Sequence, residues 1–141
     1  NAAGLSDLIN KQSGVMGLSS ISSDMREIEA AIEDGDKKAI LTMNVYNYRI
    51  KKYIGAYAAA LGGLDLLIFT GGVGENQWST RTAVCREMEF MGIKLDEAKN
   101  DHMRGKEMVI STPDSKVTVM VVPTDEELTI AKDTLEILSK E

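Results

Sequence analysis

Apolar residues recur at helical spacing in the first half of the chain. Across 24–32 they fall on one face, and Asp24 with Glu27 three positions later matches a helix-capping arrangement. Across about 36–61 they alternate at spacings of three and four, while the basic residues lie mostly off this stripe. The apolar stripe consists of Ala39, Met43, Tyr46, Ile50, Tyr53, Tyr57 and Leu61. The pattern predicts a short helix that ends at Gly35, then a long amphipathic helix that ends at a glycine pair.

The two remaining parts of the chain have shorter patterns. The composition of residues 1–21 suits a short helix at 5–11, and the glycines and serines there suit turns and a loop after it. Residues 64–69 are a nearly continuous apolar run, which is the pattern of a strand buried on both faces. The elements expected after it are a helix at 77–91, a weaker helix at 96–104, strands at 108–110 and 117–122, and a last helix from Thr124 to about Leu138.

Strands that alternate with helices predict an α/β fold, a layered domain in which helices flank a small, largely parallel sheet. The sequence shows only about three strands, and a sheet so small would expose one or both edges and a face. We therefore expect strands from a missing N-terminal region to complete the sheet. Residues 1–141 are interpreted as a single domain and as an excised fragment.

Composition and charge narrow the classes of function. The chain has 43% hydrophobic and 27% charged residues, which is ordinary for a globular protein. Its net charge of -6 would repel a polyphosphate backbone, so nucleic acid is not an expected partner. The single Cys85 cannot form an internal disulfide, and no apolar run approaches the roughly 20 residues that span a bilayer. We expect a cytoplasmic protein with no membrane partner.

The segment from Thr70 to Asn76 is the strongest candidate for a binding site. It is rich in glycine and connects the expected strand to a helix. Glycines let a ligand approach the backbone, and a helix start offers unpaired N–H groups, so a nucleotide phosphate or ribose would suit this turn. A tight turn with Asn76 or Ser79 as a helix cap explains the same residues without a ligand. The Lys-Ser/Thr ending of a Walker A loop is absent.

A second candidate site follows the expected strand at 117–122. Thr124 and Glu127 have the spacing of a capping box, which would leave Asp125 and Glu126 available. Glu126 is then the better candidate to hold Mg²⁺ beside phosphate oxygens, because α/β sheets bind ligands at the carboxyl ends of their strands. The alternative is that these acidic residues only complement a helix N-terminus.

The third candidate site is the start of the helix at 24–32. Arg26 could stack on a base or pair with a phosphate, and Asp24 could accept a ribose hydroxyl. A helix cap followed by solvated charges is the simpler interpretation. His102 has no nearby Cys or His in the sequence, so it supports neither a metal site nor a catalytic triad. Trp78 could be a surface anchor or part of a ligand rim.

These three segments, in this order, resemble the acetate kinase family, which belongs with sugar kinases, heat-shock chaperone ATPases and actin. The most specific match is Phe69 to Asn76, which is similar to the family's phenylalanine-threonine-glycine-glycine-isoleucine-glycine-glutamate-asparagine signature, with Val73 replacing isoleucine. Leu18 to Arg26 and Pro123 to Asp133 resemble two further family blocks. The resemblance covers nearly the whole chain. It implies the C-terminal portion of such a kinase, and therefore an incomplete part of a ribonuclease H-like, actin-like ATPase fold.

The resemblance also implies roles for individual residues. The nucleotide-binding residues would be Asp24, Met25, Arg26, Gly72, Val73, Gly74, Glu75, Asn76 and Arg81. The first three would contact adenosine, and the glycine segment would line the opposite side of the nucleotide. Glu126 would serve the catalytic Mg²⁺. Met25 stands where relatives often carry phenylalanine, a change that would alter adenine packing.

The family reaction is the reversible transfer of the γ-phosphoryl group of ATP to acetate, which gives acetyl phosphate and ADP. The family's catalytic arginines, histidines and aspartate come mainly from the preceding part of the protein. We therefore expect an inactive fragment with no catalytic residue of its own, which binds ATP or ADP weakly at most, and a homodimer for the complete enzyme. Two alternatives stay open: a propionate or butyrate kinase, and a non-catalytic interaction or dimerisation module that uses the apolar stripe.

Overall fold

The computed structural model describes residues 1–140. Their contacts form two compact units, Asn1–Gly63 and Leu64–Glu141. This grouping reflects the density of contacts along the chain, and the expectation of a single domain over 1–141 stays a prediction. No helix among the described residues is long and apolar enough to cross a membrane.

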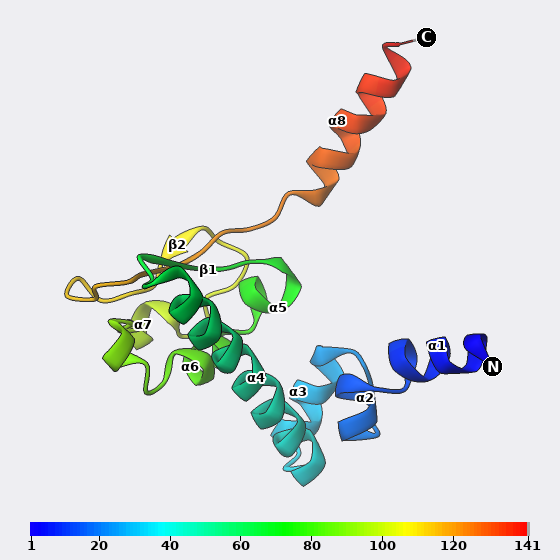
Figure 1. Ribbon diagram of the computed structural model, residues 1–141, viewed down its shortest axis with the longest axis horizontal. Helices are drawn as coiled ribbons and strands as arrows, with labels where there is room; N and C mark the ends of the chain where they lie inside the picture. Colours follow the sequence, from blue (N-terminus) through cyan, green and yellow to red (C-terminus); the bar gives the residue numbers. More distant parts are fainter. Residues whose placement is uncertain (141) are drawn as a thin grey trace. The chain divides into compact units, whose positions relative to one another are not determined.

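The first unit is helical throughout its regular structure (Figure 1). Its helices are α1 (Ala2–Lys11), α2 (Gly14–Ser19), α3 (Met25–Glu33) and α4 (Lys37–Leu61). Both α2 and α3 pack against α4. The sequence therefore predicted α1, α3 and α4 to within a few residues, whereas turns and a loop were expected where α2 forms.

The core of the first unit lies between α3 and the beginning of α4. Ile28 packs there with Ala39 and Met43, all three buried. Further along the apolar stripe, Tyr57 and Leu61 are 65% and 75% exposed in the described chain. The stripe is thus covered only at its start, where α2 and α3 supply apolar neighbours.

Helix boundaries in this unit follow from caps. Gly35 has a φ of 81° and ends α3, as its position after the pattern predicted. Asp36 caps α4, because its Oδ1 accepts hydrogen bonds from the backbone N of Lys38 at 2.7 Å and of Ala39 at 2.9 Å. At the other end of α4, Gly62 has a φ of 77°.

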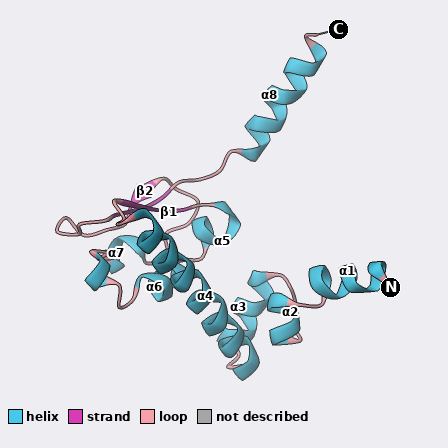
Figure 2. Cartoon of the chain, in the orientation of Figure 1, coloured by secondary structure: helices cyan, strands magenta, loops and turns pink. Residues whose placement is uncertain are grey.

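The second unit mixes short strands with helices (Figure 2). Its elements are β1 (Leu66–Phe69), α5 (Gly71–Asn76), α6 (Trp78–Cys85), the 3-10 helix η1 (Glu89–Met91), α7 (Glu97–Asn100), β2 (Met108–Val109), β3 (Thr118–Val121) and α8 (Glu126–Leu138). Its buried apolar residues come mainly from α6, β3 and the segments around η1 and β2, and include Val84, Met88, Ile93, Ile110, Val117, Val119 and Val121. No residue of α8 is buried.

The sheet has the strand order β1-β3-β2. β1 and β3 are parallel, and Phe69 is paired with Val121 at their carboxyl ends. β2 and β3 are antiparallel, because the turn between them is too short for the crossover that a parallel pair needs. The α/β fold with a small sheet and flanking helices is confirmed, and the sheet combines one parallel with one antiparallel pair.

Two expectations about the second unit are wrong in detail. β1 is not buried on both faces, because Leu66 and Ile68 are 43% and 47% exposed. β1 is an edge strand, and the described chain covers one of its faces poorly. The expected helix at 77–91 is shorter: α6 ends at Cys85, and only the 3-10 helix η1 follows within that range. The glycine segment before it forms a separate helix, α5, which Gln77 with a ψ of 84° separates from α6.

Candidate functional site

The glycine-rich segment turns directly from β1 into α5. Thr70 occupies the N-cap position with an extended backbone, and Gly71 has a φ of 69°. Asn76 lies at the end of α5, where its Nδ2 donates to the carbonyl of Gly72 at 2.9 Å. The alternative in which Asn76 or Ser79 caps the following helix is wrong, because Thr70 occupies the N-cap of α5 and Gln77 that of α6.

The three glycines of this turn differ in whether the structure requires a glycine. Gly71 needs the left-handed backbone region that other residues rarely adopt. A Cβ on Gly74 would lie 3.1 Å from the carbonyl carbon of Phe69, which is a very close contact. A Cβ on Gly72 would meet nothing within 4 Å, and its φ lies outside the left-handed region. Neither backbone conformation nor packing in this chain requires a glycine at position 72.

Glu75 of α5 is buried, and its Oε1 accepts three hydrogen bonds. This oxygen accepts hydrogen bonds from the backbone N of Gly71 at 2.8 Å, from the backbone N of Thr124 at 2.8 Å and from Oγ1 of Thr124 at 2.9 Å. The two bonds from Thr124, ahead of the bond from Gly71, lower the pKa of Glu75 below its ordinary value. The carboxylate thereby joins the segment after β1 to the segment after β3.

The capping box expected at Thr124 is not formed. The N-cap of α8 is Asp125, whose Oδ1 accepts from the backbone N of Leu128 at 2.9 Å. Thr124 instead donates twice to Glu75, and this tertiary bond competes with the local one that the sequence spacing suggested. Glu126 is the first residue of α8 and is exposed.

Glu126 fits only one kind of metal site. Among the described residues, no group of three or more His, Cys, Asp or Glu side chains could hold a metal ion. A complete protein cage for a cation is therefore not formed by residues 1–140. A single exposed carboxylate does fit Mg²⁺, since this ion commonly takes one or two protein carboxylates and completes its shell with water and substrate phosphates.

Arg81 of α6 is completely buried and donates hydrogen bonds to backbone carbonyls of the glycine turn. Its NH1 donates to the carbonyl of Gly74 at 2.8 Å and of Glu75 at 3.1 Å. Its Nε donates to Oδ1 of Asn100 at 2.7 Å, and its NH2 donates to the carbonyl of Met103 at 2.6 Å. Burial lowers the pKa of Arg81 from its ordinary value. In the described chain this guanidinium is directed to protein acceptors.

Asn100 is a residue that sequence reasoning missed. It is fully buried at the end of α7, and its Nδ2 donates to the carbonyl of Trp78 and to Oγ1 of Thr82. These bonds fix the amide so that Oδ1 can receive Arg81. An asparagine in a weakly helical, polar segment gives no sequence signal for such a position.

Asp24, Met25 and Arg26 belong to the first unit and form a local cluster. Asp24 caps α3 and pairs with Arg26, whose NH2 lies 2.6 Å from Oδ2 of the aspartate. The hydrogen bonds from the side chain and backbone of Arg26 lower the pKa of Asp24 to about 2. Met25 is half-buried against the core around Ile28. The cap that the sequence predicted at Asp24 is confirmed.

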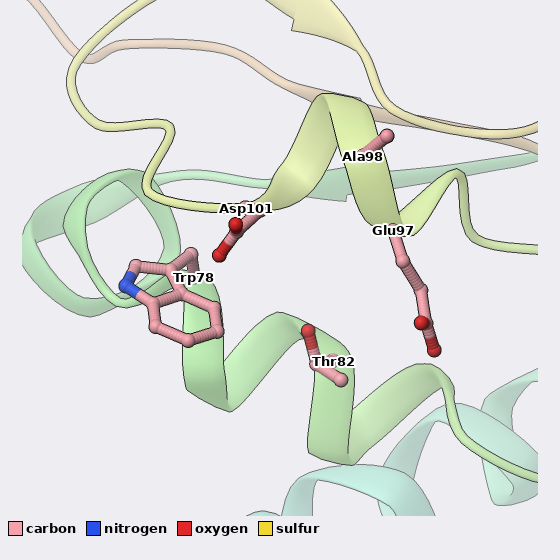
Figure 3. A pocket seen from close by; sticks show the side chains of 5 residues that line it. All are labelled: Trp78, Thr82, Glu97, Ala98 and Asp101. Atoms are coloured by element: carbon pink, nitrogen blue, oxygen red, sulfur yellow. The ribbon is translucent and has the colours of Figure 1, made fainter.

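A hollow of the second unit lies beside Trp78. It has a volume of about 310 Å³ and is lined by Trp78, Thr82, Glu97, Ala98 and Asp101. Figure 3 shows the indole and Thr82 on α6 opposite the side chains of α7 and of Asp101. The ring of His102 lies 4.8 Å from the indole, centroid to centroid, and its side chain is exposed. The tryptophan thus lines this hollow, and its role as a surface anchor or as part of a ligand rim stays a prediction.

Comparisons with known proteins identify the family of the chain. A model of the acetokinase family matches residues 1–132. The acetate kinase of Parabacteroides distasonis is 74% identical over 140 residues, which are 99% of this chain and 35% of that protein. The acetate kinase of Bacteroides thetaiotaomicron is 63% identical, with the same two shares covered. The chain thus spans about a third of the length of these relatives.

Solved structures give the same result. The crystal structure of acetate kinase from Porphyromonas gingivalis superposes with a TM-score of 0.89 at 67% identity, over 98% of this chain and 35% of that one. A propionate kinase from Francisella tularensis gives a TM-score of 0.80 at 33% identity, over 93% of this chain and 33% of that one. With a matching family model over most of its length and this shared fold, the chain belongs to the acetokinase family.

Proposed function

We propose that this chain is the nucleotide- and Mg²⁺-binding part of an acetate kinase, which transfers a phosphoryl group between ATP and acetate to give acetyl phosphate and ADP. Its similarity to acetate kinases at 74% identity supports this reaction for the complete protein. The similarity to a propionate kinase is lower, at 33% identity, and makes propionate the second candidate substrate.

The observation that carries the nucleotide site is the open space beside Gly72. A glycine inside a helix costs about 1 kcal/mol relative to alanine. In α5 neither the φ angle nor a neighbouring atom accounts for this cost at position 72. A ligand that lies against the backbone there would account for it, and a nucleotide phosphate or ribose is the ligand that fits the start of a helix after a parallel strand.

The residues divide into those that face the ligand and those that position them. Gly72 and Val73 belong to the first turn of α5, whose N–H groups have no acceptor within the helix and can point at the nucleotide. Gly74, Glu75 and Asn76 continue the same turn. Arg81 positions the turn, because its guanidinium donates hydrogen bonds to two carbonyls of this turn.

Asp24, Met25 and Arg26 are proposed to contact the adenosine part of the nucleotide. Arg26 is exposed, so its guanidinium can stack on a base when it exchanges its bond to Asp24. Met25 supplies a flexible apolar side chain beside them. This assignment rests on the family resemblance of this segment.

Glu126 would hold Mg²⁺ together with water and phosphate oxygens. When bound, the ion neutralises charge on the transferring phosphoryl group. The carboxylate at the start of α8 would orient that ion, and the glycine turn would position the phosphates. Arginines and histidines that stabilise the transferred group are expected from the part of the enzyme outside this chain, so the chain alone would bind ATP or ADP weakly and would not catalyse transfer.

A thermal-shift titration of this chain with Mg-ADP tests the nucleotide site. Bound ligand raises the melting temperature by an amount set by its concentration relative to Kd. We expect a rise that Gly72→Trp abolishes and that loses its Mg²⁺ dependence in Glu126→Ala. A rise of equal size in Gly72→Trp would overturn the proposed site.

Two further experiments concern the complete protein, which on the family resemblance is proposed to be a cytoplasmic homodimer. Initial rates with acetate, propionate and butyrate at equal concentration identify the acyl substrate, and acetate should give the highest kcat/KM. Sedimentation with and without Mg-ADP tests the alternative of a pure interaction module. Such a module would associate identically in both conditions and would show no thermal shift.

A further inference from the structure

The bond between Glu75 and Thr124 connects two segments that are 49 residues apart. β1 and β3 are parallel neighbours, so the residues after Phe69 and after Val121 leave the same edge of the sheet. The backbone N of Val122 donates to the carbonyl of Phe69 at 3.0 Å, which extends the pairing by one step. Beyond Val122, the backbone pairing of the two strands ends, and Thr124 is held by its hydrogen bonds to Glu75.

The carboxylate of Glu75 is a strong anchor for this segment. Both hydrogen-bonding groups of Thr124 donate to the same oxygen, and the backbone N of Gly71 supplies the third donor. Hydrogen bonds to an ionised acceptor are about twice as strong as those between neutral groups. Glu75 is only 9% exposed, whereas Thr124 is exposed, so the bonds between them are partly buried.

The anchor ends two residues before Glu126. Thr124 is fixed by Glu75, and Asp125 is fixed as the N-cap of α8 through its bond to the backbone N of Leu128. The two residues that precede Glu126 are therefore both held by hydrogen bonds. Thr124 is thereby linked to Gly71, the first residue of α5, because both donate to the same oxygen atom of Glu75.

We propose that Glu75 is a positioning residue that sets Glu126, and with it the Mg²⁺, at a fixed place relative to the glycine turn, and that it does not itself bind the nucleotide. This inference rests on the proposed function, because it needs Glu126 to serve the metal. It changes the role that the family resemblance implied for Glu75. The carboxylate of Glu75 is occupied by its bonds to Gly71 and Thr124, and the ligand side of the turn is left to Gly72 and Val73.

Metal affinity measured apart from nucleotide affinity tests this role in the complete protein. Mn²⁺ replaces Mg²⁺, and its binding to the ADP complex is followed by the electron paramagnetic resonance of free Mn²⁺. ADP affinity without metal is measured by calorimetry. Glu75→Gln keeps the shape of the side chain but removes its charge, and Thr124→Val removes one donor. Partners in the outer shell of a metal site typically change metal affinity by about 10- to 100-fold.

We expect both variants to weaken Mn²⁺ binding by about tenfold while metal-free ADP affinity stays within about twofold. Thr124→Ser should bind Mn²⁺ as tightly as the wild type does, because it keeps the hydroxyl that donates to Glu75. Thr134→Val is the matched control: Thr134 lies on α8, and among the described residues its hydroxyl donates to the local carbonyl of Ile130. This control should leave both affinities unchanged.

Other outcomes overturn the role. A loss of metal-free ADP affinity in Glu75→Gln would place this residue in the nucleotide pocket, and unchanged Mn²⁺ affinity in both variants would show that the bond does not position Glu126. If Glu75→Gln does not fold, Thr124→Val and Thr124→Ser decide alone. The proposed function fails separately, by wild-type protein that does not bind Mg-ADP or by Glu126→Ala that binds Mn²⁺ as the wild type does.

Discussion

Arg81 and Asn100 form a hydrogen bond of 2.7 Å between two side chains that are both completely buried. The arginine comes from α6 and the asparagine ends α7, so the bond fastens these helices to each other. The remaining donors of the guanidinium reach the carbonyls of Gly74, Glu75 and Met103. One side chain thus satisfies three buried or partly buried carbonyls and supports the end of the glycine helix.

Replacing Arg81 should destabilise the chain strongly. Arg81→Met keeps an apolar stem but leaves Asn100 and three carbonyls without their donor, and each buried unsatisfied group costs about 1–3 kcal/mol. We expect a loss of at least about 3 kcal/mol in the free energy of unfolding, measured by urea denaturation. Arg49→Met is the matched control at an exposed arginine of α4 and should stay within about 0.5 kcal/mol. Equal losses in the two variants would contradict the buried role.

The glycines of α5 should respond differently to alanine. Gly72→Ala should stabilise the chain by about 0.5–1 kcal/mol, because helical glycine carries an entropic cost and the new Cβ meets no atom within 4 Å. Gly74→Ala should destabilise it, because its Cβ would lie 3.1 Å from the carbonyl carbon of Phe69. Thermal melts without ligand distinguish these two directions.

The same glycine comparison separates stability from binding. Gly55 of α4 also has open space around its Cβ position, so Gly55→Ala is a matched control with the same expected stabilisation. Only Gly72→Ala should weaken Mg-ADP binding in a calorimetric titration. If Gly55→Ala and Gly72→Ala bind alike, the open space at Gly72 does not receive the nucleotide.

Local features of the fold were predictable because they depend on residues that are close together in the sequence. The spacing of apolar residues gave α3 and α4, and Gly35 marked the boundary between them. The apolar run before the glycine segment gave β1, but such a run does not say which faces the chain itself covers. Leu66 and Ile68 are exposed for this reason.

Features that depend on distant partners were not predictable. Thr124 and Glu127 have the spacing of a capping box, yet Thr124 bonds to Glu75 across 49 residues of sequence. Nothing near Arg81 in the sequence indicates that it meets Asn100. Single-sequence patterns describe which bonds a segment can form locally, and tertiary packing then decides which of them are formed.

The ion pair at the start of α3 should be visible in a titration. The side-chain and backbone hydrogen bonds from Arg26 lower the pKa of Asp24 to about 2, from its ordinary value of 3.8. Arg26→Gln should raise this pKa toward 3.8, because it removes the charged donor while the backbone bond remains. The carboxyl carbon shift of Asp24, followed by NMR against pH, measures the change. Arg49→Gln should leave the Asp24 titration unaltered, and a shift there of similar size would point to a general charge effect.

Glu75 should make the stability of the chain depend on pH in the acid range. Its folded pKa is lowered below 4.5 by its bonds to Thr124 and Gly71, so ionised Glu75 favours the folded state above that pH. As pH falls through the lowered folded pKa, the carboxylate is protonated and this contribution is lost. Urea denaturation at about pH 7 and about pH 3 should therefore show a smaller loss of stability in Glu75→Gln than in the wild type.

Two variants test whether that pH dependence arises from the Thr124 bond. Thr124→Val removes the hydroxyl but keeps the backbone donor, so the loss of stability between the two pH values should be intermediate. Glu97→Gln removes an exposed carboxylate outside this network and should follow the wild type. If Glu75→Gln loses as much stability on acidification as the wild type, Thr124 does not hold an ionised carboxylate, and the link between the glycine turn and the start of α8 is weaker than its three short hydrogen bonds indicate.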